Sequence, residues 1–308
     1  MPSNSRRAFL MGRRTLRTPW EAFCQHMNRA MEGTFYDFGE QNGVGSARLT
    51  PAHSSDVQRA RELCVEHGVT MALDGVQHAS ALDDFPVLWI DPGRDMAECK
   101  RIADDSPYWF VQPGCMLGEL EAVGLRQFRD LPAHLTVAAW LADRGLCDWR
   151  TGETYKSGLQ HASVMLADGT RATLGPFGEN SHQPLEGLTL QRLVPALFEQ
   201  STSQAAQTCR GQEFWPARYR LDALLPVPGQ TVNLAHLLLG HGGDLGWVDW
   251  VVLDERVDNE IEASYFPRFS TNHEAHDDDT WLAASDADSQ VKYVFDPSNL
   301  FPFPGQNL

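Results

Sequence analysis

Several features are missing from this sequence of 308 residues, and each absence removes a class of protein. There is no G-x-S-x-G segment and no G-x-x-x-x-G-K-[ST] segment, so nothing supports a serine hydrolase with a nucleophile elbow or a P-loop nucleotide triphosphatase. No apolar run approaches the ~18 residues that a membrane-spanning helix needs. We therefore predict a chain without a membrane span.

Positive charge is also scarce. Lysine and arginine together number 25 against 41 aspartates and glutamates, which gives a formal net charge of -16. A protein that binds nucleic acid must neutralise phosphates, so this balance argues against a nucleic-acid partner. It does not exclude an anionic cofactor, because a few oriented backbone N–H groups can hold a diphosphate inside an acidic protein.

No two cysteines form a C-x-x-C pair, and the six that are present lie far apart in the chain. This pattern is typical of free thiols in a reducing compartment, so we predict a cytoplasmic protein. Residues 5–12 also resemble the start of a twin-arginine export signal. Arg13, Arg14 and Arg17 then stand where such a signal needs an uncharged apolar stretch, which leaves export as the alternative.

Short strands mixed with helices predict an α+β fold. We expect a helix over 20–31, a glycine-rich linker over 33–45, and a second helix capped by Ser54 or Ser55 and ended by Gly68. The expected strands cover residues 47–51, 69–73, 87–91 and 108–112, with a helix over 116–123 and a hairpin over 163–174. Residues 254–288 are acidic and lack apolar periodicity, and residues 291–297 again indicate ordered structure.

The order of these segments resembles the FAD-binding domain shared by vanillyl-alcohol oxidase, p-cresol methylhydroxylase, glycolate oxidase and D-lactate dehydrogenase. The motifs that carry the resemblance are residues 51–73, 113–120, 135–140, 154–159, 164–169, 219–222, 237–248 and 295–305. We accordingly divide the chain into a basic arm and helix (1–45), an FAD-binding domain (46–254), and an acidic linker with a tail (255–308).

The resemblance implies a two-subdomain fold of the p-cresol methylhydroxylase type, with FAD as cofactor. It implies an oxidoreductase, a flavoprotein acting on a 2-hydroxy acid such as glycolate or lactate. The substrate-covering cap of full-length relatives is largely missing between residue 254 and the tail. The chain is therefore most similar to the short FAD-binding subunit of bacterial glycolate oxidase, and a partner oxidase subunit would complete the substrate pocket. No catalytic base is assigned.

The resemblance also places the cofactor-binding residues. These are Gly75, Val76, Gln77, His78, Ala79, Gly114, Thr136, Val137, Ala138, Ala139, Gly243, Gly246 and Val248. Residues 75–79 correspond to the diphosphate loop, where glycines let backbone amides approach the ligand. Non-covalent FAD is expected, and His78 offers the alternative of covalent attachment through its imidazole.

Two further alternatives stay open. Asp74 stands where the family has an arginine, and Val76 resists the positive φ that glycine permits, so the same fold could serve as a flavin-free structural or regulatory subunit. His273 and His276 have a His-x-x-His spacing beside carboxylates, which is a remote third hypothesis. Because this is not the H-E-x-x-H spacing of zinc proteases, we predict no metal site.

Overall fold

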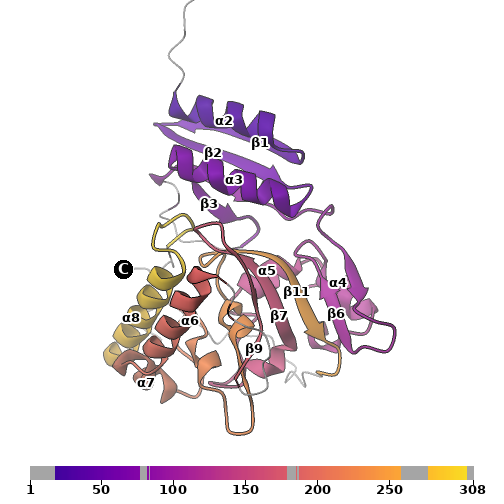
Figure 1. Cartoon of the computed structure of the whole chain (residues 1–308), viewed down its shortest axis with the longest axis vertical. Helices are drawn as coiled ribbons and strands as arrows, with labels where there is room; N and C mark the ends of the chain where they lie inside the picture. The colour runs from indigo at the N-terminus through magenta and orange to yellow at the C-terminus, as the bar shows by residue number, and fades with distance from the viewer. Residues whose placement is uncertain are drawn as a thin grey trace, which may run out of the picture.

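A computed structural model describes residues 18–76, 82, 84–178, 185, 187–257 and 277–303 of the chain. These residues form a smaller N-terminal lobe and a larger C-terminal lobe, each with its own sheet (Figure 1). Helices and strands are mixed in both lobes, so the predicted α+β class with two subdomains is confirmed.

The N-terminal lobe contains a four-stranded sheet in the order β1-β2-β4-β3. Its strands are β1 (Thr34–Gln41), β2 (Val44–Thr50), β3 (Thr70–Leu73) and β4 (Val87–Ile90). β1 and β2 form an antiparallel hairpin, whereas β2 and β3 both run parallel to the central β4. Parallel strands need a crossover connection, and α3 (Ser54–His67) supplies it between β2 and β3.

The other helix of this lobe, α2 (Pro19–Ala30), begins with a capping box. The Thr18 side chain accepts from the Glu21 amide, the Glu21 side chain accepts in return, and Pro19 takes a position where no N–H is needed. α2 packs on α3, and the fully buried Asp56 of α3 accepts from three backbone amides around residue 33 and residue 52. These bonds fix the turns on both sides of the hairpin.

The C-terminal lobe is built on a five-stranded antiparallel sheet in the order β5-β6-β11-β7-β8. Its strands are β5 (Cys99–Arg101), β6 (Tyr108–Val111), β7 (Leu159–Met165), β8 (Arg171–Leu174) and β11 (Trp247–Asp254). β9 (Pro176–Phe177) and β10 (Val232–Asn233) form a small separate pair. The long central β11 pairs with both β6 and β7, which places the segment before it close to the sheet centre.

Helices surround this sheet. They are α4 (Leu117–Ala122), α5 (Val137–Ala142), α6 (Leu188–Ser201), α7 (Gln204–Arg210), α8 (Asp278–Phe295) and the 3-10 turns η2 (Arg126–Phe128), η3 (Thr154–Ser157), η4 (Leu221–Leu224) and η5 (Leu234–Leu238). α6, α7 and α8 gather on one side of the lobe and pack on one another (Figure 1). None of the helices in the described part of the chain is long and apolar enough to cross a membrane.

The two lobes share one apolar core cluster. Met71, Leu73 and Ile90 of the first sheet belong to the same cluster as Ala138 of α5 and Trp247 of β11. Hydrogen bonds cross the junction as well. The Arg61 guanidinium donates to the Ala167 carbonyl oxygen at 2.6 and 2.8 Å, and Arg171 donates to the Ser54 carbonyl oxygen at 2.8 Å. The chain also returns after α8, so that the Met71 amide donates to the Leu300 carbonyl oxygen.

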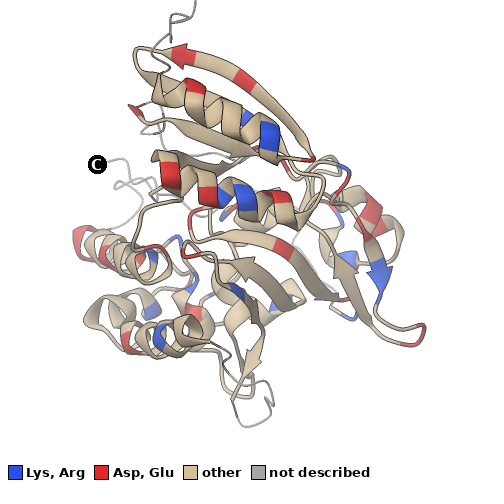
Figure 2. Ribbon diagram, turned by 45° about the horizontal axis from the view of Figure 1, so that its top comes forward, with Lys and Arg blue, Asp and Glu red and all other residues tan. Residues whose placement is uncertain are grey.

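Charge is spread over both lobes. Figure 2 shows acidic and basic positions interspersed along the helices and strands, and in this view the described residues form no face that is basic alone. Most predicted elements of both lobes are present within a few residues, including the hairpin at Asp168–Gly169 and the left-handed Gly68 at the end of α3.

Two local predictions were wrong. Residues 33–45 are not a linker, because β1 and the start of β2 occupy them, and the proposed boundary at residue 45 falls inside β2. Neither Ser54 nor Ser55 caps α3; His53 holds the cap position without a side-chain bond. The end of the acidic stretch lies in α8, where Ala284 and Ala287 are buried.

Candidate functional site

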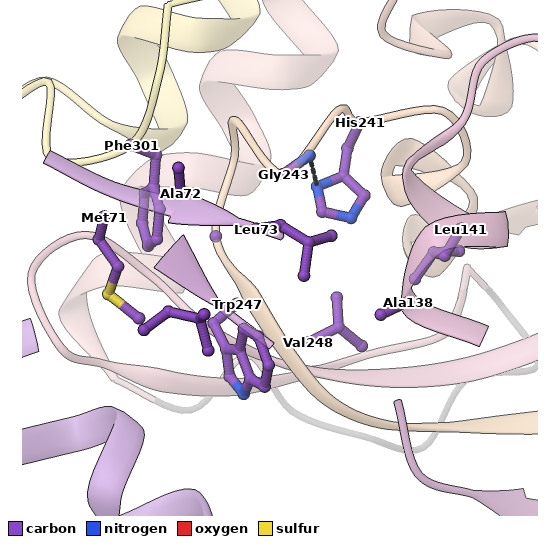
Figure 3. A pocket seen from close by; sticks show the side chains of 12 residues that line it. Met71, Ala72, Leu73, Ala138, Leu141, His241, Gly243, Trp247, Val248 and Phe301 are labelled. Atoms are coloured by element: carbon purple, nitrogen blue, oxygen red, sulfur yellow. Dashed lines mark hydrogen bonds between the residues drawn. The ribbon is translucent and has the colours of Figure 1, made fainter. Parts of the chain in front are cut away.

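A pocket lies where the two lobes meet (Figure 3). Small-molecule sites in proteins are lined mostly by apolar groups. The lining residues are Met71, Ala72, Leu73, Ile90, Ala138, Leu141, His241, Gly243, Gly246, Trp247, Val248 and Phe301. They come from both sheets, α5, the glycine-rich turn before β11 and the tail.

The walls of the pocket are fixed by elements that the local sequence specifies. β3 is a short, almost fully buried strand, and Leu73 at its carboxyl end points into the pocket (Figure 3). On the opposite wall, Thr136 caps the N-terminus of α5, because its hydroxyl accepts from the Ala139 amide at 3.2 Å. Ala138 of that first turn faces the pocket with only a methyl group.

The glycine-rich turn forms the third wall. Gly240, Gly242 and Gly243 have φ of 78°, 67° and 79°, a region that other residues rarely adopt. At Gly246 the limit is space, since an added Cβ would lie 2.8 Å from the Met165 carbonyl oxygen. Glycine is therefore required here to let the turn approach β7 and open the pocket.

His241 is the polar group of the wall. Its side chain is buried, and Nδ1 accepts a hydrogen bond from the Gly243 amide at 3.2 Å (Figure 3). That bond assigns Nδ1 as an acceptor, which leaves the ring proton on Nε2 in the neutral imidazole. His241 therefore has an N–H donor at Nε2 within an otherwise apolar surface.

Trp247 is held in place from behind the pocket. Its indole N–H donates to the buried Asp249 carboxylate at 3.1 Å, and Arg171 lies 3.2 Å from the other oxygen of that carboxylate. Burial raises the pKa of Asp249, and the Arg171 charge lowers it only in part. The Asp249 carboxylate, itself paired with Arg171, thus orients the indole, and the flat Trp247 ring forms a fixed part of the wall.

The structure brings together some of the predicted cofactor-binding residues. Ala138, Gly243, Gly246 and Val248 line the pocket. Thr136, Val137 and Ala139 belong to the start of α5 beside it. Other predicted residues lie elsewhere: Gly114 is buried in the turn before α4, Gly75 is exposed after β3, and Val76 packs on the core of the N-terminal lobe.

Gln77, His78 and Ala79, the remaining predicted positions, lie outside the described residues, as do His273 and His276. The wall residues that sequence reasoning missed are mainly those of β3 and the tail, such as Met71 and Phe301. Both segments were recognised as motifs, but their proximity to α5 is a long-range contact that no local pattern records. His241 lies within residues 237–248, a segment that carries the family resemblance.

FAD has two parts, and the described residues fit them unequally. The apolar pocket with one N–H donor suits a flat ring system such as isoalloxazine. A diphosphate needs several backbone amides that converge on it. The predicted amides instead donate within the chain: Gly75 to Asp74, Gly114 to Met96, Val137 to Cys115, Ala138 to Pro113, Ala139 to Thr136 and Gly243 to His241.

Asp74 adds a second obstacle for a diphosphate. Its carboxylate accepts from the Gly75 amide at 2.9 Å and lies 3.8 Å from the Arg48 guanidinium. A carboxylate at this loop would repel a phosphate group. The lining of the pocket therefore has the apolar character that a flavin ring needs, but the described residues do not form an amide cradle for its diphosphate.

No family model matches the chain, and no curated protein matches it. Solved structures do match. An alkyldihydroxyacetonephosphate synthase is 14% identical over 68% of this chain and 32% of that chain, with a TM-score of 0.37. A 4-ethylphenol oxidase from Gulosibacter chungangensis, in complex with isoeugenol, is 15% identical over 77% and 42%, with a TM-score of 0.42.

A BBE-like 1 variant from Physcomitrella patens is 10% identical over 75% of this chain and 44% of that chain, also with a TM-score of 0.42. The chain thus spans less than half the length of each of these structures. Such scores do not assign the chain to a family.

Proposed function

We propose that the chain is the FAD-binding part of an FAD-dependent oxidoreductase, with the flavin ring in the pocket between the lobes. The observation that carries the proposal is a convergence. Ala138, Gly243, Gly246 and Val248, selected from two separate sequence motifs, line one apolar pocket together with β3. The motif resemblance supplies the identity of the cofactor.

In this proposal the protein binds and orients the cofactor. Leu73, Leu141 and Val248 exclude water from the ring, and the fixed Trp247 indole forms a flat wall beside it. Bound FAD would supply the acceptor for the hydride that the substrate loses, and the hydroxyl proton would pass to a base that we do not assign. We propose a 2-hydroxy acid as substrate, because the motifs are most similar to those of the glycolate oxidase and D-lactate dehydrogenase family, with a partner subunit completing the substrate pocket.

A second candidate is a flavin-free protein with the same fold that acts as a structural or regulatory subunit. The specific observation that favours it is that several predicted cofactor-binding amides donate within the chain, among them the Gly75 amide to the Asp74 carboxylate. Both candidates share the fold and the pocket, so only a measurement of cofactor binding separates them.

The test begins with the absorbance of the purified chain. Oxidised flavin gives bands near ~370 and ~450 nm, and a ligand that binds only the native state raises its melting temperature. Ala138→Leu would fill the pocket, whereas Ala122→Leu enlarges an exposed alanine of α4 as a matched control. We expect FAD to raise the melting temperature of the wild type and the control but not of Ala138→Leu.

A colourless chain whose melting temperature ignores added FAD would refute the oxidoreductase proposal and favour the flavin-free subunit. If flavin is present, a denaturing gel separates the two modes of attachment. A fluorescent protein band after acid treatment indicates covalent attachment, and His78→Ala then tests that residue. Absence of the band leaves non-covalent FAD.

A further inference from the structure

Three potential metal ligands meet on the surface of the N-terminal lobe, and none of them lines the pocket. His26 belongs to α2, and Glu66 and His67 form the end of α3. One ligand atom from each of the three lies within 4.8 Å of the others. His26 Nδ1 and His67 Nε2 are only 3.1 Å apart, and Glu66 Oε1 lies 3.9 Å from His67 Nε2.

These separations are close to those of a tetrahedral zinc site. Zn–N bonds of ~2.0–2.1 Å at the tetrahedral angle place two ligand nitrogens about 3.4 Å apart. The observed 3.1 Å between the imidazole nitrogens differs from this by a few tenths of an ångström. The Glu66 side chain is 62% exposed, so a rotamer change without backbone movement brings its carboxylate the short remaining distance.

The two helices hold the imidazoles in this arrangement. His67 is the last residue of α3, since the left-handed Gly68 ends the helix, and only 13% of its side chain is exposed. The ring of the buried Phe23 meets the His67 ring edge to face at 5.7 Å. Because α2 and α3 pack on each other, His26 is held against His67 from the other side.

We propose that His26, Glu66 and His67 form a binding site for a divalent transition metal ion of the zinc class. The three side chains supply two neutral imidazole nitrogens and one carboxylate oxygen, and water supplies the fourth ligand. The bound ion joins the end of α3 to α2 and so stabilises the N-terminal lobe. This site is separate from the interlobe pocket, and it does not depend on whether the chain binds FAD.

The experiment is a zinc titration of the tag-free, metal-stripped chain, by calorimetry and by competition with a chromophoric chelator. We expect one ion per chain and a higher melting temperature with zinc, because a ligand of the native state stabilises it. Co²⁺ in place of zinc should give the intense visible bands of tetrahedral coordination.

Three variants locate the ion. His26→Gln removes one ligand from an exposed position and is expected to weaken binding by at least about tenfold, the lower bound seen when even outer-shell partners of metal ligands are lost. Glu66→Gln should weaken it less. His53→Gln is the matched control, since His53 is also exposed and lies 3.9 Å from a carboxylate, that of Glu32.

Two results would overturn the proposal. One is the absence of zinc binding to the wild type at 100-fold molar excess. The other is zinc affinity in His26→Gln equal to that of the wild type, which would place the ion elsewhere, for example at His273 and His276. Loss of binding in the His53→Gln control would have the same meaning.

Discussion

Lys292 of α8 is the residue whose replacement should destabilise the chain most clearly. Its side chain is 1% exposed, and Nζ donates to the Asp244 carbonyl oxygen at 2.8 Å, the Asp296 carboxylate at 2.6 Å and the Phe301 carbonyl oxygen at 3.1 Å. Lys292→Met keeps the apolar stem and removes the charge. The buried Asp296 carboxylate and two carbonyl oxygens then lose their common donor.

Breaking a buried ion pair by removing one partner costs about 3–5 kcal/mol. At typical urea dependences this lowers the unfolding midpoint by more than about 1 M. The measurement is urea unfolding followed by tryptophan fluorescence, to which the buried Trp140 and Trp215 contribute. Lys100→Met is the control, because Lys100 pairs with Glu98 at 2.8 Å on the surface and should contribute only ~0–1 kcal/mol.

A loss below about 1 kcal/mol in Lys292→Met would refute this reasoning. It would mean that the Ser298 hydroxyl and the amides of Leu300 and Phe301, which also donate to Asp296, hold the carboxylate without the lysine. The same variant reports on the pocket, since Phe301 lines it. We therefore expect any FAD-dependent rise in melting temperature to shrink as well.

Three further predictions follow from buried groups. Burial raises the pKa of Asp56, but three backbone amides and the Arg59 charge outweigh it, so the net pKa is lowered. The free energy of unfolding should therefore fall as the pH drops through that pKa, and Asp56→Asn should reduce this loss of stability at acidic pH. Burial lowers the pKa of His236 to about 4, so stability should decline by about 3 kcal/mol from pH 6.5 down to 4, and His236→Gln should remove that slope. Gly246→Val should lower the melting temperature, with about 1–3 kcal/mol lost to overpacking against β7, and a stability equal to wild type would show that the turn has room.

Local patterns were sufficient for most strands of the fold. β3, β4 and β6 are short apolar runs bounded by turn residues; β3 and β4 are mostly buried, whereas β6 is only partly buried. The hairpin of β1 and β2 was missed because its glycines were interpreted as a linker. The sequence did contain the signal, which is the dipeptide Asn42-Gly43. Both residues have the positive φ that a two-residue hairpin turn of type I′ requires.

The site was less predictable for a physical reason. Motifs located Ala138 and Gly246, whose backbones must approach other segments closely, but they could not show that β3 and the tail complete the pocket. The His26–His67 pair shows the same limit, because its two imidazoles are 41 residues apart in the chain. Only the packing of α2 on α3 brings them together.

The bond between the Met71 amide and the Leu300 carbonyl oxygen has a consequence for synthesis on the ribosome. Domains generally fold as units, N-terminal first, while the chain is still being made. Here the first sheet has an acceptor for one of its edge amides only after residue 300 has been translated. The Met71 amide at the edge of this sheet therefore lacks this acceptor until nearly the whole chain has been made.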